Sequence, residues 1–179
     1  MRVIAGSRKG HKLAAPRGLD TRPTSDRVRE NIFNLVGPVE QARVLDLFAG
    51  SGALGIEALS RGAASAVFVE HDSEAVRTIE RNLDRLRLTR ARVVHGDVVR
   101  TIAQEAGAGA EYDLVLVDPP YGMLTEIQPR LARHLPQLLA ADGLVVLETD
   151  ARTEPELPLT VRTSRKYGQT RVTLFEASR

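Results

Sequence analysis

The tetrapeptide Asp118-Pro119-Pro120-Tyr121 follows the apolar run 114–117, at the expected C-terminal end of a buried strand. A carboxylate there can accept a hydrogen bond from an amino N–H. Neither proline nitrogen carries a hydrogen, so carbonyls of this stretch are free to face a ligand. The Tyr121 ring offers a face on which a planar base can stack. These four residues are therefore candidate catalytic residues that hold a planar group bearing an exocyclic amine; a Pro-Pro turn with a polar cap is the structural alternative.

A second candidate site lies in the segment 44–55, which has the pattern of a strand, a tight glycine turn and the start of a helix. Gly50, Gly52 and Gly55 fit the dinucleotide fingerprint, in which glycines let the backbone approach a ligand at a helix N-terminus. Glu70 closes the next apolar run about 20 residues after the first glycine, where the fingerprint expects a ribose-binding acid. The fingerprint alone is a weak signal. Its combination with the later Asp-Pro-Pro-Tyr is much more specific.

Two further acids indicate which ligand is bound. Asp46 stands four residues before Gly50, where its charge does not favour a pyrophosphate but does favour the sulfonium and ammonium groups of S-adenosylmethionine. Asp97 ends the third expected strand and is a candidate acceptor for the amino group of adenine. It is equally a candidate N-cap for the helix that follows, and both roles can hold at once. The acids favour S-adenosylmethionine over NAD as the cofactor.

The composition is that of one α/β domain with a sizeable core, because 179 residues are too few for two such domains. No run approaches the ~18 apolar residues of a membrane span, and the N-terminus lacks the apolar core of a signal peptide. The chain has no cysteine, which excludes disulfides and thiolate sites, and its four histidines show no metal-ligand spacing. We expect a cytoplasmic protein with no metal, no membrane contact and no obligate protein partner.

Basic charge is concentrated at the N-terminus. Residues 1–31 hold eight Arg and Lys against three acids, a net charge of +5, and the remainder carries −3. The segments 2–5 and 11–14 flank a Gly- and Lys-containing stretch and predict a β-hairpin with a basic tip. A basic arm on a mildly acidic body indicates a polyanion partner, and the candidate nucleic-acid contacts are Arg8, Lys9, Lys12 and Arg22.

The remaining pattern positions these residues. Residues 1–22 are expected to form the arm and a linker, and residues 23–179 the catalytic domain, which opens with a helix from Thr24-Ser25-Asp26. From 43 onward strands alternate with helices, which predicts a mostly parallel sheet covered on both faces, with ligands above the C-terminal strand ends. The expected elements are 43–48, 52–61, 66–70, 73–87, 91–95, 97–106, 112–117, 124–140 and 143–149, followed by an antiparallel hairpin of strands 159–166 and 170–177.

With these residues in view, the chain resembles the class I S-adenosylmethionine-dependent methyltransferases, with a Rossmann-like seven-stranded sheet. It is most similar to the bacterial 16S rRNA guanine-N2 methyltransferase family, known as the RsmD family. The resemblance covers essentially the whole chain. It is carried by Arg2–Gly6, Thr21–Glu30, Phe33–Leu35, Asp46–Gly55 and Asp118–Gly122, of which the Arg-Pro-Thr segment is the most specific to the family.

The resemblance implies roles for these positions. The cofactor-binding residues would be Asp46, Phe48, Ala49, Gly50, Ser51 and Gly52 at the methionine end, Glu70 and His71 at the ribose, Asp97 near the adenine, and Asp118. The stretch from Asp118 to Tyr121 would hold the target base. The implied substrate is one guanine in the RNA of the small ribosomal subunit, within a subunit particle.

Rival interpretations differ in class. DNA adenine-N6 methylation uses the same tetrapeptide, but such enzymes normally need a further sequence-reading domain. Protein glutamine methylation would more often place Asn at position 118. An NAD-dependent oxidoreductase fits the three glycines but leaves Asp46 and the 118–121 segment unexplained. A non-catalytic RNA-binding module fits the basic arm and none of the acids.

Overall fold

A single mixed sheet organises the protein. The structure, a computed structural model, describes residues 1–16, 25–120 and 122–177. Seven strands lie in the order β3-β2-β1-β4-β5-β7-β6. The first five of these are parallel, while β7 pairs antiparallel with both β5 and β6. The predicted mostly parallel sheet with an antiparallel hairpin at one edge is confirmed.

The elements have the following bounds. The strands are β1 (Arg43–Leu47), β2 (Ser65–Glu70), β3 (Ala91–His95), β4 (Tyr112–Val117), β5 (Leu139–Asp150), β6 (Thr160–Tyr167) and β7 (Thr170–Glu176). The helices are α1 (Asp26–Val36), α2 (Ala53–Ser60), α3 (Ser73–Leu86), α4 (Val98–Gly107) and α5 (Leu124–Leu138), with a short 3-10 helix η1 (Gly6–Arg8) near the N-terminus. Strand β5 begins four residues earlier than expected, directly where α5 ends.

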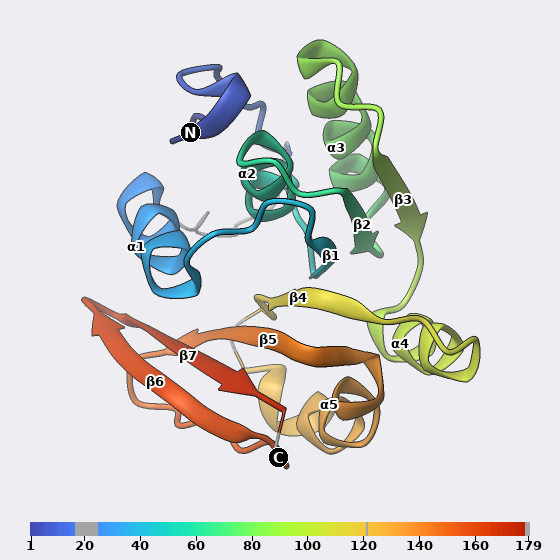
Figure 1. Cartoon of the computed structure of the whole chain (residues 1–179), viewed down its shortest axis with the longest axis vertical. Helices are drawn as coiled ribbons and strands as arrows, with labels where there is room; N and C mark the ends of the chain where they lie inside the picture. Colours follow the sequence, from blue (N-terminus) through green and yellow to red (C-terminus); the bar gives the residue numbers. More distant parts are fainter. Residues whose placement is uncertain (17–24, 121, 178–179) are drawn as a thin grey trace.

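Helices cover both faces of the sheet, with α1, α2 and α3 on one side and α4 and α5 on the other (Figure 1). Each face has its own apolar core. Ile32, Ile56 and Phe68 belong to the first core, and Ile102 and Leu131 to the second. Strands buried on both faces explain the continuous apolar runs of the sequence, because neither face of a central parallel strand meets water. In the described part of the chain, no helix is long and apolar enough to cross a membrane.

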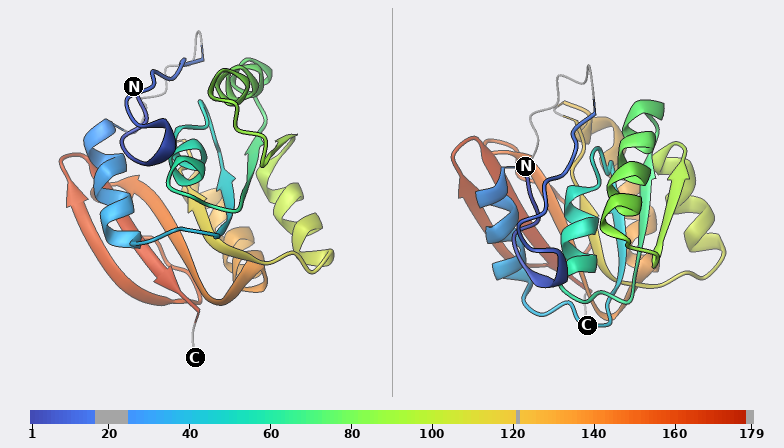
Figure 2. Two further views of the ribbon diagram at one scale, coloured as in Figure 1. Left: turned by 45° about the horizontal axis from the view of Figure 1, so that its top comes forward. Right: turned by 90° about the horizontal axis from the view of Figure 1, so that it is seen from above.

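The N-terminal arm differs from its prediction. The expected β-hairpin is wrong in detail: residues 6–8 form η1, and the two sides of the arm meet in a single antiparallel bridge between Arg2 and Lys12. The ladder ends there because His11 N, which would donate back to Val3, donates instead to the Arg8 carbonyl at 3.2 Å. Beyond it, Ile4 N and Ala5 N donate to the buried carboxylate of Glu57 on α2 at 2.8 and 3.0 Å. The arm therefore lies along α2 (Figure 2).

Buried charged groups of α1 and α2 hold this arm in place. The Glu57 side chain is fully buried and also accepts from Arg61 Nε at 2.8 Å. Arg29 of α1, likewise buried, lies 3.9 Å from Glu57 and donates to the carbonyl of Arg2. The arm's Val3 and Leu13 join the same apolar core as α2. A buried carboxylate is stable only when paired and hydrogen-bonded. The arm supplies two of the hydrogen bonds that Glu57 needs, and Glu57 in turn holds the arm against α2.

Candidate active site

Four acids stand at the C-terminal edge of the four adjacent strands β3, β2, β1 and β4. Glu70 is the last residue of β2, Asp46 is the penultimate residue of β1, Asp118 directly follows β4, and Asp97 follows β3 by two residues. Parallel strands end on the same side of a sheet, and ligands of open α/β folds bind beyond those ends. The sheet thus gathers the acids that the sequence singled out along one edge.

Asp46 caps the N-terminus of α2 from the neighbouring strand β1. Its side chain is buried, and Oδ2 accepts a hydrogen bond from the backbone N–H of Gly55 at 2.9 Å. The helix has Gly52 as its N-cap residue and no side-chain cap of its own, so Asp46 supplies the anion that a helix N-terminus favours. Gly55 is required here, because a Cβ would lie 2.4 Å from Cε1 of Phe68 and 3.0 Å from Oδ2 of Asp46.

The electrostatic state of Asp46 reflects its neighbours. Burial raises the pKa of the Asp46 carboxyl well above its usual value; the Gly55 hydrogen bond lowers it, and the negative charges of Asp118 and Glu70 raise it further. Asp118 and Glu70 place negative charge beside the Asp46 carboxyl and the glycine turn. Such a site favours a cation placed among them.

The turn between β1 and α2 is tightly wound. Phe48, Gly50 and Gly52 all have positive φ, at 60°, 57° and 77°. At Gly50 an added Cβ would meet nothing nearer than the Phe48 carbonyl oxygen at 4.0 Å, so this part of the turn faces open space. The backbone of Ala49 to Ser51 is partly exposed. A ligand can approach the backbone at this turn, as the fingerprint interpretation requires.

Glu70 holds the turn in place. Its side chain is only 8% exposed. Oε2 accepts from Gly50 N at 2.9 Å, and Oε1 accepts from His71 N and Asp72 N at 2.8 and 2.9 Å. The His71 ring lies beside it, with Nδ1 3.1 Å from Oε1. Since a carboxylate offers about four acceptor positions, Oε2 keeps capacity for a further donor such as a hydroxyl.

Asp97 caps α4. Its side chain accepts from the Arg100 N–H at 2.8 Å, in the geometry of an N-cap. The predicted N-cap role is confirmed, and the residue is exposed at the rim of the edge. Next to it the His95 ring contacts the His71 carbonyl at 3.0 Å, which joins the loops after β2 and β3. The proposed contact of Asp97 with adenine remains a prediction.

The Asp118 segment leads from β4 towards α5. The Asp118 N–H donates to the carbonyl of Leu47 at 3.4 Å, which continues the β1–β4 pairing beyond the last strand residue. Pro119 is buried and Pro120 is exposed. The Pro120 carbonyl accepts from Met123 N at 3.1 Å, so the carbonyl of Pro119 is the better candidate to face a ligand. Tyr121 lies outside the described residues.

Asn82 is a site residue that the sequence analysis missed. It lies on α3 and is 2% exposed. Nδ2 donates to the carbonyls of Ser51 and Ala14 at 3.0 and 3.1 Å, and Oδ1 accepts from Ala14 N at 2.9 Å. One amide thus joins the glycine turn to the N-terminal arm. Its partners lie 31 and 68 residues away, so no local pattern could have revealed it.

The partners of the backbone N–H groups in the glycine turn distinguish between the candidate ligands. A pyrophosphate needs free backbone N–H groups at the helix N-terminus. Here the N–H groups of Gly50, Gly52 and Gly55 bind Glu70, the Ala49 carbonyl and Asp46, respectively. What the turn presents instead is carboxylate charge. This arrangement suits a cationic ligand with amino and hydroxyl donors far better than a dinucleotide phosphate.

The candidate nucleic-acid contacts are dispersed over the arm. Arg8 lies in η1 beside the C-terminal end of α2, where its N–H donates to Ser60 Oγ at 2.9 Å. Lys9 and Lys12 are exposed, and the Lys12 carbonyl accepts from Arg85 at 2.5 Å. Arg22 lies outside the described residues. The arm's first residue and Ala14 approach the glycine turn, through Met1–Ser51 and Ala14–Asn82 contacts.

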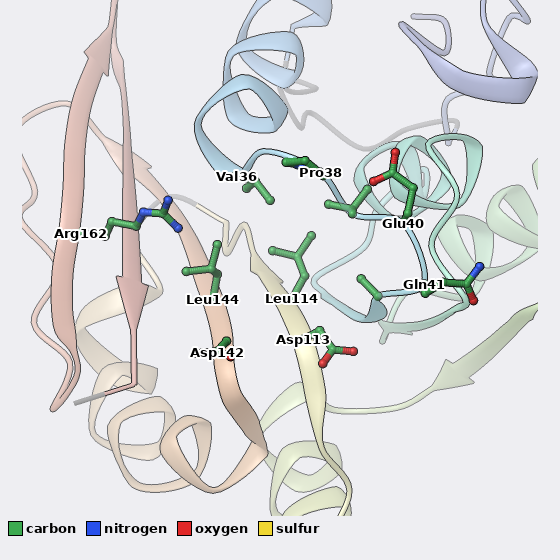
Figure 3. Close-up of a pocket in the computed structure, with 11 residues that line it drawn as sticks. Val36, Pro38, Glu40, Gln41, Asp113, Leu114, Asp142, Leu144 and Arg162 are labelled. Carbon is green, nitrogen blue, oxygen red and sulfur yellow. The ribbon is translucent and has the colours of Figure 1, made fainter. Parts of the chain in front are cut away.

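A cavity of about 430 Å³ lies elsewhere, at the opposite edge where β1, β4 and β5 begin. Figure 3 shows it lined by apolar side chains with Glu40, Asp113 and Asp142, facing Arg162 of β6. Asp113 is held there by Arg43, whose Nε lies 3.1 Å from Oδ2. None of the four acids at the C-terminal strand edge lines this cavity, so it lies apart from the candidate active site.

The strand order, the acid-lined glycine turn after β1 and the Asp-Pro-Pro segment after β4 define a class I methyltransferase. Within that class, the chain belongs to the family described as Conserved hypothetical protein 95, whose model matches residues 1–176. The resemblance found in the sequence is thereby confirmed.

Relatives cover nearly the whole chain. It is 43% identical over 189 residues to the Bacillus subtilis protein named "Putative rRNA methyltransferase YlbH", covering 98% of each chain. It is 41% identical over 153 residues to the Escherichia coli "Ribosomal RNA small subunit methyltransferase D", covering 84% of this chain and 75% of that one. A solved structure titled "Putative methyltransferase yhhF from Escherichia coli" superposes with a TM-score of 0.84 at 37% identity, over 99% and 98% of the two chains.

Proposed function

We propose that the protein transfers the methyl group of S-adenosylmethionine to the exocyclic N2 amine of a guanine in small-subunit ribosomal RNA. The observation that carries the proposal is the set of three carboxyl groups, Asp46, Glu70 and Asp118, around a glycine turn whose three glycine amides are already bound. This environment favours a sulfonium and an ammonium group and disfavours a phosphate. The Asp-Pro-Pro-Tyr segment then accounts for the amine acceptor.

The cofactor fits the residues present. Asp46 and the segment from Phe48 to Gly52, which is partly exposed as far as Ser51, would face its methionine end. Glu70 with His71 would face its ribose, and Asp97 its adenine. The spare acceptor capacity of Glu70 Oε2 and the open space at Gly50 support this assignment. When bound, S-adenosylmethionine supplies a methyl group activated by the sulfonium charge.

Asp118 and the Pro119 carbonyl would orient the nucleophile. The guanine amine is a poor nucleophile, because its lone pair is delocalised into the ring. Two N–H···O hydrogen bonds, to Asp118 and to Pro119, would turn that lone pair towards the methyl group, and Tyr121 would hold the plane of the base. Positioning of this kind can lower a barrier by several kcal/mol.

The proton and charge balance of the step is simple. A nitrogen–carbon bond forms as the sulfur–carbon bond breaks, and the sulfonium charge is lost. The alkylated amine is acidic and gives its proton to Asp118 or to water, so no strong base is needed. The base must leave any stack to reach Asp118, which favours a loop or a flipped nucleotide as the target.

Ribosomal RNA as the substrate is supported by the relatives, two of which are named as rRNA methyltransferases. The basic arm supplies charge for a polyanion. We infer further that the substrate is presented in a small-subunit particle in the cytoplasm. DNA adenine and protein glutamine are the competing amine substrates, since the same tetrapeptide logic would serve each.

A transfer assay tests the proposal. Purified protein is incubated with S-adenosylmethionine labelled in its methyl group and, in parallel, with small-subunit particles, naked 16S rRNA, adenine-containing duplex DNA and a glutamine-containing protein mixture. Label is expected in RNA, with the particle the better substrate. Label in DNA or protein alone, or equal labelling by an Asp118→Ala variant, would overturn the assignment.

A further inference from the structure

A basic surface cluster is assembled from two segments that are far apart in the sequence. The arm contributes Arg8, Lys9 and Lys12, and the end of α3 with the turn after it contributes Arg85, Arg87 and Arg90. Between the two segments lies a pocket of about 190 Å³ whose lining includes Arg8, Arg87 and Arg90 together with Ser7 and Thr89. Cationic and hydroxyl side chains around one small concavity are suited to an oxyanion.

The two segments are locked together by short contacts. Gly6 packs so closely on α2 that a Cβ would lie 1.9 Å from the Ser60 carbonyl oxygen. Arg8 Nε donates to the carbonyl of Leu86, the last residue of α3, at 2.7 Å. Arg85 reaches back to the Lys12 carbonyl at 2.5 Å. These contacts fix the side chains of Arg8 and Arg85 and hold the two segments side by side, which reduces the entropy lost when a ligand binds.

The charges of the cluster are not neutralised within the protein. Other arginines of the same region are neutralised, because Arg77 and Arg81 pair with Glu74 and Arg92 pairs with Glu105. Among the residues that the structure describes, no member of the basic cluster forms an ion pair, and Asp84 is the only acid between 84 and 90. Five of the six side chains are exposed and Arg8 is partly so. The paired arginines fit a solvated helix face, whereas the unpaired ones call for an external anion.

Arg87 has a backbone that does not favour an arginine. It ends α3 with φ 52° and ψ 47°, the left-handed conformation in which glycine is preferred at a helix terminus. A side chain kept in an unfavourable backbone position is consistent with a functional demand on that side chain. Binding of an anion by the unpaired Arg87 guanidinium at the pocket would be such a function.

The part of the cluster around the pocket, Arg8, Arg87 and Arg90, lies at the end of the molecule opposite the candidate active site, whereas Lys12 stands two residues before Ala14, which approaches the glycine turn. Helix α3 starts beside Glu70 and runs 14 residues back to the edge where β3 begins, a length of about 21 Å at 1.5 Å per residue. Arg87 and Arg90 are thus too far from Asp118 to touch the same nucleotide. A ligand that engages both must be an extended polyanion.

We propose that the basic cluster binds backbone phosphates of the substrate RNA at a point about 20 Å from the methylated base. This inference rests on the proposed rRNA methyltransferase function. The cluster sets RNA affinity and register, while the acidic edge performs the chemistry. A protein partner with an acidic surface is the alternative occupant.

The test uses an Arg87→Gly/Arg90→Ala variant, because glycine removes the charge and also relieves the left-handed backbone. The matched control is Arg130→Ala/Arg133→Ala, which removes two exposed charges from α5 on the other face of the sheet. Binding of naked 16S rRNA and of small-subunit particles is measured by filter retention over a salt series, together with the melting temperature and the affinity for S-adenosylmethionine.

The first variant is expected to bind both RNAs about tenfold more weakly and to reduce the slope of log K against log salt by roughly 1.4, at about 0.7 per lost phosphate contact. Its melting temperature and cofactor affinity should not fall, and the control should match the wild type. Unchanged RNA affinity, or an equal loss in the control, would overturn the inference. A loss confined to the particle would also overturn it and point to a protein partner. Because binding is measured without catalysis, absence of methyl transfer by the wild type would sink the proposed function alone.

Discussion

The Asp46→Asn substitution tests two effects of this carboxylate: it lowers the stability of the ligand-free protein, and it raises the affinity for S-adenosylmethionine. The carboxyl is buried, and burial together with Asp118 and Glu70 raises its pKa well above the usual value. A raised acid pKa adds stability that is complete below the unfolded pKa and is lost as the pH rises through the folded pKa. The ligand-free wild type should therefore lose stability over that range, and the Asp46→Asn variant should lack this loss.

Cofactor binding should change in the opposite direction. The Asn carbonyl oxygen can still accept from Gly55 N, so the helix N-terminus keeps its cap. What disappears is the negative charge opposite a cation, and a hydrogen bond to a charged group contributes about 1.5–3 kcal/mol. The dissociation constant for S-adenosylmethionine should therefore rise by roughly 10- to 150-fold.

Calorimetric titration with S-adenosylmethionine across a pH series, paired with melting curves without ligand, measures both effects. In the wild type, affinity should rise with pH as Asp46 ionises, because the cofactor's cation stabilises the charged form. The variant should lose that rise. Unchanged affinity in the variant, or the same pH dependence in both proteins, would refute the role given to Asp46.

Substitutions at three further positions test the other site residues. Asp118→Ala should abolish methyl transfer while changing cofactor affinity only a few-fold, and Asp118→Asn should retain partial activity because its carbonyl can still accept from the amine; full activity of the alanine variant would remove Asp118 from the mechanism. Glu70→Ala should weaken S-adenosylmethionine at least tenfold through lost charge-assisted hydrogen bonds and should lower the melting temperature by freeing Gly50 N and His71 N; a lower melting temperature with unchanged affinity would make Glu70 structural. Asn82→Asp keeps the bond from Ala14 N but cannot donate to Ser51, so cofactor affinity should fall several-fold while kcat at saturation is kept, whereas a purely structural residue would change only the melting temperature.

The sequence was sufficient for the sheet and for the acids at its edge. Glu70 and Asp118 could be located because each follows an apolar run, and Asp46 because it stands four residues before Gly50. Parallel strands end on one side of a sheet, which brings the three acids to one edge. Boundaries within one or two residues followed from the same runs for most elements. The start of β5 was missed, since Leu139 and Ala140 continue the apolar pattern of α5 and nothing local marks the change from helix to strand.

What the sequence could not reveal are contacts between distant segments. Asn82 reads as an ordinary polar residue of an amphipathic helix, and only the fold shows that it binds Ser51 and Ala14. Glu57 lies in a mainly apolar helix without any sign that it takes the backbone donors of the arm. The predicted hairpin is replaced by a 3-10 turn where His11 N donates to the Arg8 carbonyl, a contact that the residue pattern does not reveal. The contact of Arg85 with the Lys12 carbonyl likewise depends on where the arm lies.

Methylation of a guanine N2 amine in small-subunit rRNA is tested by identifying the methylated nucleoside. Small-subunit particles whose rRNA lacks the modification are incubated with the protein and S-adenosylmethionine carrying a deuterated methyl group, and the digested rRNA is analysed by mass spectrometry. We expect labelled N2-methylguanosine at one position, absent when the Asp118→Ala variant is used. Label in N6-methyladenosine, at another atom of guanosine, or in ribosomal protein instead of rRNA would contradict it.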